Sequence, residues 1–174
     1  MSGDLALLWA GAETFTAFMA RVESQPALWE GVYRTAKLPG WATEAFDNLP
    51  HGIRMLVLNA DWCLDSANTV PVLARLTEAV AGVELRLLER DAHLDVMDRY
   101  LTEGARSIPL VILLDRDFRP LGRWGPRPAE LQAWVLAHKE SVPKEERYKE
   151  ERKWYARDRG ETTLREILKV ASRP

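Results

Sequence analysis

The chain has 174 residues, a formal net charge of −2, 47% hydrophobic residues and 29% charged residues. This length suits one well-buried domain, and so small a net charge gives no overall field to attract nucleic acid or an anionic membrane. One cysteine and three histidines offer no metal-ligand cluster. No apolar run approaches the roughly 20 residues that span a bilayer. We therefore expect a protein without metal or other cofactor that binds neither nucleic acid nor membrane.

Residues 1–50 are predicted to form a helical addition. Apolar residues recur at helical spacing from Glu13 to Val22 and from Leu28 to Ala36. Pro26 suits the start of the second helix, and Pro39 suits its end. Since the beginning of the chain lacks the basic and long apolar segments of a secretory signal, and one cysteine cannot form an internal disulfide, we expect a cytoplasmic protein.

Residues 51–140 are predicted to form an α/β core. Short apolar runs predict strands, and apolar residues at helical spacing predict the helices between them. The expected strands are 53–59, 83–88, 110–114 and 119–124, with a turn at 115–118. The expected helices begin after residue 63, at residue 94 and at residue 129. This order favours a mixed sheet with helices on both faces.

Residues 141–174 are rich in lysine, glutamate and arginine and are predicted to form two further helices. Aromatic residues such as Trp154 and Tyr155 are expected to pack on the core or on each other. The charged residues of this tail are interpreted as a solvated helix face, since they alternate in sign. The core and both additions are expected to form one domain, residues 1–174.

Cys63 is the only cysteine, and it lies between a predicted strand and a predicted helix. Backbone N–H groups and the helix dipole at a helix N-terminus favour the thiolate, which is the nucleophilic form. Ser66, in the first turn, offers a hydroxyl hydrogen bond to the sulfur, while the charges of Asp61 and Asp65 oppose the thiolate. We therefore expect a solvent-accessible nucleophile favoured by the helix, assisted by Arg106 if the fold brings that cation close.

Simpler interpretations of the flanking residues stay open at this point. One is that Asp61 and Asp65 serve only as favourable charges near the start of a helix. Another is that Ser66 is solvated and has no part in the chemistry.

Several landmarks resemble those of thioredoxins in order and spacing. They are Trp62-Cys63, Pro71, the segment Arg106-Ser107-Ile108-Pro109 ahead of a strand, and Gly125. The resemblance covers about residues 52–140 and implies a thioredoxin-like fold in which Cys63 begins the active-site helix. It also implies a cis Ile108–Pro109 bond against the thiol, with Trp62, Ile108 and Pro109 shaping a substrate groove. Segments 122–128 and 154–160 resemble, more loosely, a group of bacterial thioredoxin-like proteins.

Three departures from that pattern narrow the expected chemistry. Ser66 stands where thioredoxins have a second cysteine, Leu64-Asp65 replaces Gly-Pro, and Val57 replaces a buried acid. An internal dithiol cycle is therefore impossible, and the remaining activity is monothiol exchange with protein or small-molecule thiols and disulfides through Cys63. Two alternatives are a redox-inactive binding module that uses the groove beside Pro109, and a single-cysteine peroxide sensor.

Overall fold

A four-stranded mixed sheet forms the centre of the protein, which is described here by a computed structural model over residues 2–173. The strand order is β2-β1-β3-β4. Strand β1 pairs parallel with β2 and antiparallel with β3, and β3 pairs antiparallel with β4. The strands are β1 (Ile53–Asn59), β2 (Val83–Glu89), β3 (Leu110–Leu114) and β4 (Pro120–Trp124). The mixed sheet expected from the sequence is confirmed.

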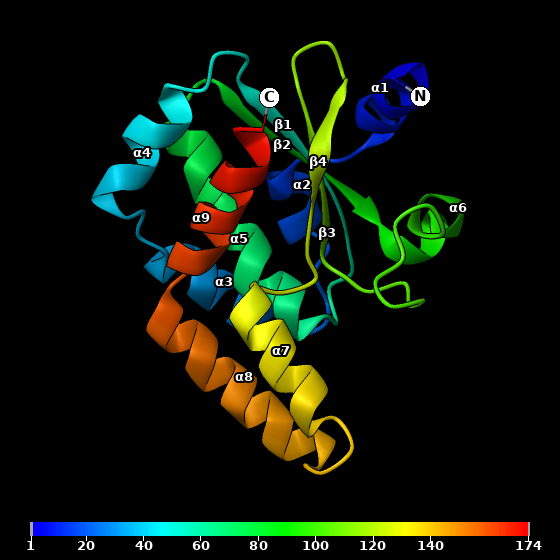
Figure 1. The fold of residues 1–174 in the computed structure, drawn as a ribbon, viewed down its shortest axis with the longest axis vertical. Helices are drawn as coiled ribbons and strands as arrows, with labels where there is room; N and C mark the ends of the chain where they lie inside the picture. The colour runs from blue at the N-terminus through cyan, green and yellow to red at the C-terminus, as the bar shows by residue number, and fades with distance from the viewer. Residues whose placement is uncertain (1, 174) are drawn as a thin grey trace.

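Helices surround this sheet and make up both ends of the chain (Figure 1). They are α1 (Ser2–Gly11), α2 (Phe15–Met19), α3 (Pro26–Thr35), α4 (Gly40–Asp47), α5 (Leu64–Ala79), α6 (Leu94–Met97), α7 (Ala129–His138), α8 (Lys144–Asp158) and α9 (Glu161–Ala171), with a 3-10 turn η1 (Arg90–Ala92). Within residues 2–173, none of them has the length and apolarity that crossing a bilayer requires. The extra terminal helices are as expected.

Alternate residues of the central strands face two separate cores. Met55 and Val57 on β1 point into a core formed with α2, α3, α4, α5 and α9. Leu56 and Leu58 point to the other face, where they pack with residues of α1 and α6. Figure 1 shows α4 and α9 on one side of the sheet and α1 and α6 on the other. Because both faces are covered at the centre of the sheet, β3 is entirely apolar and β1 is apolar apart from Arg54 and Asn59.

Three helical segments differ from the expectation. Helix α1 contains apolar residues on all sides and so shows no helical period in the sequence. Helix α3 ends at Thr35, before Pro39 as expected, but Pro39 then stands at the N-cap of α4, a helix that the sequence analysis did not predict. Helix α6 stops at Met97, before residue 101, and the left-handed backbone of Glu103 and Gly104 then turns the chain, closed by hydrogen bonds between Thr102 and Ala105.

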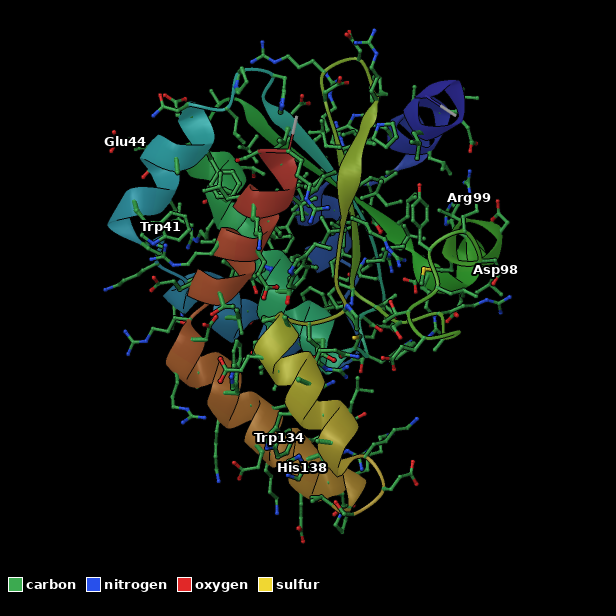
Figure 2. The ribbon with its side chains drawn as sticks, in the orientation of Figure 1. Trp41, Glu44, Asp98, Arg99, Trp134 and His138 are labelled. Carbon is green, nitrogen blue, oxygen red and sulfur yellow. The ribbon has the colours of Figure 1, made fainter. Side chains whose placement is uncertain are left out.

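Helices α7 and α8 form an antiparallel pair that extends beyond one end of the sheet (Figure 1). Leu131 and Val135 of α7 pack with Tyr155 of α8, and the rings of Trp134 and His138 stack 4.5 Å apart on α7 (Figure 2). Gly160 then turns the chain into α9 with φ +82°, and a Cβ there would lie 2.6 Å from Val72 of α5. The tail is thus pressed against the helix that begins at Cys63.

Candidate functional site

Cys63 occupies the N-cap of α5, directly after the turn that follows β1. Its Sγ accepts a hydrogen bond from the backbone N–H of Ser66 at 3.4 Å and donates one to the carbonyl oxygen of Ile108 at 3.4 Å. The residue is 8% exposed, so only a small part of it reaches solvent. The predicted position at the helix start is confirmed, whereas the expectation of an open thiol is wrong.

Two cis peptide bonds lie beside the thiol. Ile108–Pro109 is cis, as the resemblance implied, and Gly125–Pro126 is also cis. The two segments touch: a Cβ on Gly125, whose φ is +120°, would lie 2.1 Å from the carbonyl oxygen of Pro109. This close approach explains why a glycine stands there.

A pocket of about 280 Å³ opens onto Cys63. Ile108 and Pro126 line it, but Pro109 is buried behind them, so the predicted groove wall is formed by its neighbour and by the second cis proline. Both terminal additions take part in the walls. The lining residues are Gln25, Trp62, Cys63, Leu64, Asp65, Arg90, Arg106, Ser107, Ile108, Pro126, Arg127, Tyr148 and Arg152.

The thiol of Cys63 is less acidic than the helix start alone predicts. Burial raises the pKa of Cys63, and the negative charge of Asp65 raises it further. Hydrogen bonding from Ser66 and from the backbone N–H of Asp65 lowers the pKa, but these effects are smaller. The direction expected from the sequence is therefore wrong, because the cost of burying a thiolate exceeds the benefit of the helix N-terminus.

Ser66 is completely buried beneath the thiol. Its hydroxyl oxygen has no hydrogen-bond partner of acceptable geometry, although its proximity to Cys63 lowers the pKa of the thiol. The interpretation of Ser66 as a solvated residue is wrong. Its free hydroxyl remains available to a thiolate when one forms.

Asp65 belongs to a buried cluster of charges that the sequence analysis did not predict. One carboxylate oxygen accepts a hydrogen bond from the Tyr155 hydroxyl at 2.7 Å, and the other lies 2.7 Å from Arg127 Nη2. Arg127 Nε in turn lies 3.5 Å from Glu151 Oε2. Asp65 is 4% exposed and Glu151 1%. Asp65 is therefore not a solvated charge at the helix start but the link between α5 and α8.

Burial dominates the titration of this cluster. It raises the pKa of Asp65, although Arg127 and Tyr155 act to lower it. Burial, followed by the charge of Asp65, raises the pKa of Glu151 to about 7, even though Arg127 and Arg147 oppose the rise. Glu151 is thus a carboxyl group that changes its charge near neutral pH.

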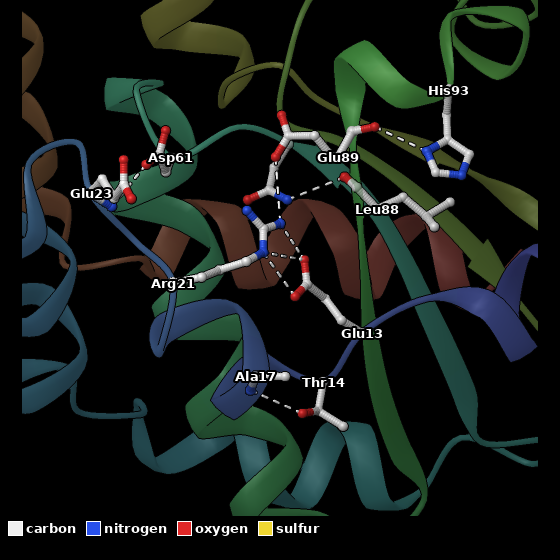
Figure 3. A network of polar contacts seen from close by, with 10 residues as sticks. Glu13, Thr14, Ala17, Arg21, Glu23, Asp61, Leu88, Glu89 and His93 are labelled. Atoms are coloured by element: carbon white, nitrogen blue, oxygen red, sulfur yellow. Dashed lines mark hydrogen bonds and ion pairs between the residues drawn. The ribbon is translucent and has the colours of Figure 1, made fainter.

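Asp61 holds the N-terminal segment and is not among the groups that shift the pKa of Cys63. Its carboxylate accepts hydrogen bonds from the backbone N–H groups of Glu23 at 3.0 Å and Ser24 at 2.9 Å. Figure 3 shows this contact beside a second one, in which Arg21 lies between the carboxylates of Glu13 and Glu89. Both contacts fix the chain that leads into α3, so the role of Asp61 is structural.

The remaining predicted site residues lie on the rim of the pocket. Trp62 is 48% exposed, with the guanidinium group of Arg90 4.8 Å from its ring centroid. Arg106 forms a two-point contact with Asp98, with hydrogen bonds of 2.7 and 2.8 Å; Figure 2 places Asp98 at α6. Arg106 is not among the groups that shift the pKa of Cys63. It therefore contributes charge to the pocket rather than acidity to the thiol.

A family model described as thioredoxin matches residues 12–154. The chain belongs to this thioredoxin family. The fold is shared with the crystal structure of a protein of unknown function from Pseudomonas aeruginosa, which is 24% identical, with a TM-score of 0.74 over 95% of each chain. It is also shared with an HIV epitope scaffold that is 21% identical, with a TM-score of 0.73 over 95% of each chain. No curated protein sequence matches the chain.

In this thioredoxin-family protein, the acidic side chains near the site do not come from β1. Val57 is fully buried in the apolar core, so no acid stands behind Cys63 on β1. The buried acids near the site are instead Asp65, in the first turn of α5, and Glu151, on α8 of the tail. Within residues 2–173, no three histidine, cysteine, aspartate or glutamate side chains gather as a metal site would require.

The sequence contained one signal for the residues that were missed. Tyr148, Arg152 and Tyr155 recur at the spacing of one helix face, and Glu151 lies on the same face. Aromatic residues and a charged residue on one face of a helix indicate that this face packs against another element that contains polar groups. Interpreting the tail as a solvated face overlooked this pattern, and the position of Arg127 after Pro126 gave no indication of its partner.

Proposed function

We propose that the protein is a cytoplasmic monothiol that exchanges with mixed disulfides through Cys63. The observation that carries the proposal is the pocket of about 280 Å³ that opens onto the one cysteine of the chain. Cys63 stands at the start of α5, where the N–H of Ser66 points at its sulfur. Such donors stabilise a sulfur anion as it forms.

The exchange proceeds in two steps. The Cys63 thiolate attacks one sulfur of a substrate disulfide, the substrate S–S bond breaks, and the departing sulfur leaves as a thiolate that takes up a proton. An external thiolate then attacks the mixed disulfide, displaces the sulfur of Cys63 and restores the free thiol. Oxidation and reduction balance because each step exchanges one S–S bond for another.

The raised pKa of Cys63 has two consequences for this reaction. Little of the thiol is ionised at neutral pH, so the rate rises as the pH rises. Once formed, the mixed disulfide breaks slowly at Cys63, because a thiolate with a raised pKa is a poor leaving group. The site therefore favours a long-lived adduct over rapid turnover.

The test is the reaction of the full chain with hydroxyethyl disulfide, followed by intact mass and by release with excess cysteine. We expect one adduct on the wild type and none on Cys63→Ser. Ser66→Ala should form the same adduct roughly fivefold more slowly, since a donor to the thiolate contributes on the order of 1 kcal/mol. An unmodified wild-type protein, or equal de-thiolation activity in Cys63→Ser, would refute the proposal.

A redox-inactive binding module is the second candidate, and the burial and raised pKa of Cys63 favour it. It predicts capture of a partner that is unchanged by Cys63→Ala and by reductant. Capture only as a disulfide-linked adduct would exclude it. The same two observations argue against a peroxide sensor, because a sensor cysteine is exposed and has a low pKa.

A further inference from the structure

The side chains that line the pocket above Cys63 carry more positive than negative charge. Among residues 2–173, its walls contain four arginines, Arg90, Arg106, Arg127 and Arg152, but only one carboxylate, that of Asp65. That carboxylate is already bound to Arg127 and to the Tyr155 hydroxyl. The other three guanidinium groups therefore face the pocket without a carboxylate inside it.

These three arginines differ in how far they are neutralised. Arg90 pairs with Asp91, whose side chain is 55% exposed, and Arg106 pairs with Asp98, whose side chain is 50% exposed. Solvent screens such exposed pairs strongly. Among residues 2–173, the side chain of Arg152 has no ion-pair partner, in contrast to those of Arg90, Arg106 and Arg127, and it makes no side-chain hydrogen bond. It is thus the pocket's free cation within the described part of the chain.

The neighbours of Arg152 indicate a small polar ligand. Tyr148 lies one helical turn before Arg152 on α8, so both side chains lie on the same helix face. Gln25 borders the pocket from the N-terminal side. A volume of about 280 Å³ lies at the small end of the range for ligand pockets. It suits a small molecule better than a folded segment of another protein.

We propose that this pocket binds the carboxylate-bearing half of a disulfide, with Arg152 as the main anion-binding side chain and Arg90 and Arg106 beside it. The inference rests on the proposed function of Cys63 and names its substrate class, disulfides of small anionic thiols. Arginine suits this task because its planar fork matches a carboxylate. When Cys63 attacks the substrate and the S–S bond breaks, the sulfur that leaves departs as a thiolate beside these cations, which stabilise it before it takes up a proton.

The test compares two alkylating reagents that differ in charge and have similar size and the same leaving group. Iodoacetate is anionic and iodoacetamide is neutral, and neither requires disulfide exchange. For each reagent, the rate at Cys63 in the native chain is divided by the rate in the urea-unfolded chain. We expect the normalised rate for iodoacetate to exceed that for iodoacetamide at least about fivefold at low salt, and the excess to shrink as ionic strength rises.

Matched variants on α8 identify the side chain responsible. Arg152→Ala should reduce the fivefold preference to less than about twofold. Arg157→Ala removes the same charge from the same helix, outside the pocket walls, and should leave the preference unchanged. Arg152 also borders a second hollow of about 850 Å³ beside α3. If Arg152 acted only in that second hollow, Arg152→Ala would keep the preference of Cys63 for iodoacetate. That result would overturn the proposal.

A binding measurement covers the case in which the buried thiol resists both reagents. Cys63→Ala protein is titrated with dithiodiglycolate, which carries two carboxylates, and with neutral hydroxyethyl disulfide, while the NMR signal of the Trp62 indole is followed. Binding of the first alone, lost in Cys63→Ala/Arg152→Ala, supports the proposal. Equal binding of both, or binding of neither, overturns it. Reaction of the wild type with hydroxyethyl disulfide but without any anionic preference would leave the proposed exchange intact and reject only the substrate class.

Discussion

The two terminal additions hold the chain around Cys63 in different ways. On the N-terminal side the contacts reach the backbone of the turn that precedes α5. The indole N–H of Trp29 donates to the carbonyl oxygen of Asp61 at 2.9 Å, and the amide of Gln25 donates to that of Trp62 at 3.3 Å. Because no proton is gained or lost in these contacts, they do not change between mildly acidic and mildly basic pH.

On the C-terminal side, buried charges hold the first turn of α5. Asp65 connects α5 to Arg127 and to Tyr155 of α8, and Arg127 faces Glu151 of the same helix. Since Glu151 has a pKa of about 7, one carboxyl group in this contact changes its charge near neutral pH. The difference teaches that the contact of α8 with the first turn of α5 responds to pH, whereas the two backbone contacts made by Trp29 and Gln25 do not.

The largest expected effect comes from breaking the buried charges. Asp65→Ala leaves Arg127 without its close partner and Tyr155 without its acceptor, so the free energy of unfolding should fall by about 3–5 kcal/mol. Urea denaturation at pH 7 measures it. Asp65→Asn keeps an acceptor for Tyr155 and should lose less. A change below about 1 kcal/mol for Asp65→Ala would contradict the assignment of Asp65 as the link to α8.

Glu151→Gln tests whether the C-terminal contact titrates. The pKa of Glu151 rises from 4.5 to about 7 on folding, so the native state binds this proton more tightly than the unfolded state. Its contribution to stability is present below pH 4.5 and is lost as the pH rises through about 7. The loss amounts to about 3 kcal/mol at most.

The measurement is urea denaturation across that pH range. In Glu151→Gln, the free energy of unfolding should fall less steeply with rising pH than in the wild type. In Glu150→Gln, on the exposed side of α8, it should fall as steeply as in the wild type. If the free energy of unfolding depends on pH in the same way in both variants, Glu151 is not the group that titrates.

Trp29→Phe tests the N-terminal contact. The substitution removes the hydrogen bond to Asp61 and part of a fully buried ring, so we expect a loss of about 2 kcal/mol. In contrast to Glu151→Gln, the loss should be the same at pH 5 and pH 8. A loss that grows or shrinks between these values would mean that the N-terminal contact is also linked to protonation.

The contrast between these two contacts also shows what the sequence could reveal. The apolar run at β1 and the helical period after Cys63 predicted the sheet order and the N-cap position, because burial of apolar residues produces a regular pattern. Helix α4 was missed because Pro39 was interpreted as an end rather than a beginning.

The buried charges could not be predicted in the same way. Asp65, Arg127 and Glu151 belong to three distant segments, and each alone resembles a solvated surface charge. The rise in the pKa of Cys63 was missed for a similar reason, because it depends on burial in the folded protein and on the charge of Asp65. Local sequence indicated the helix start but not what covers it.

Asp61→Asn should have the smallest effect and completes the comparison. Asp61 and Asp65 flank Cys63 symmetrically in the sequence, yet the Asp61 carboxylate accepts hydrogen bonds from the backbone of Glu23 and Ser24, and asparagine keeps one acceptor for these N–H groups. We expect a loss below about 1 kcal/mol and no change in the midpoint of Cys63 alkylation against pH. Asp65→Asn should lower that midpoint, since the charge of Asp65 raises the pKa of the thiol. If both variants lower it equally, the two aspartates act on the thiol in the same way, and the distinction between a structural carboxylate and one that controls the thiol fails.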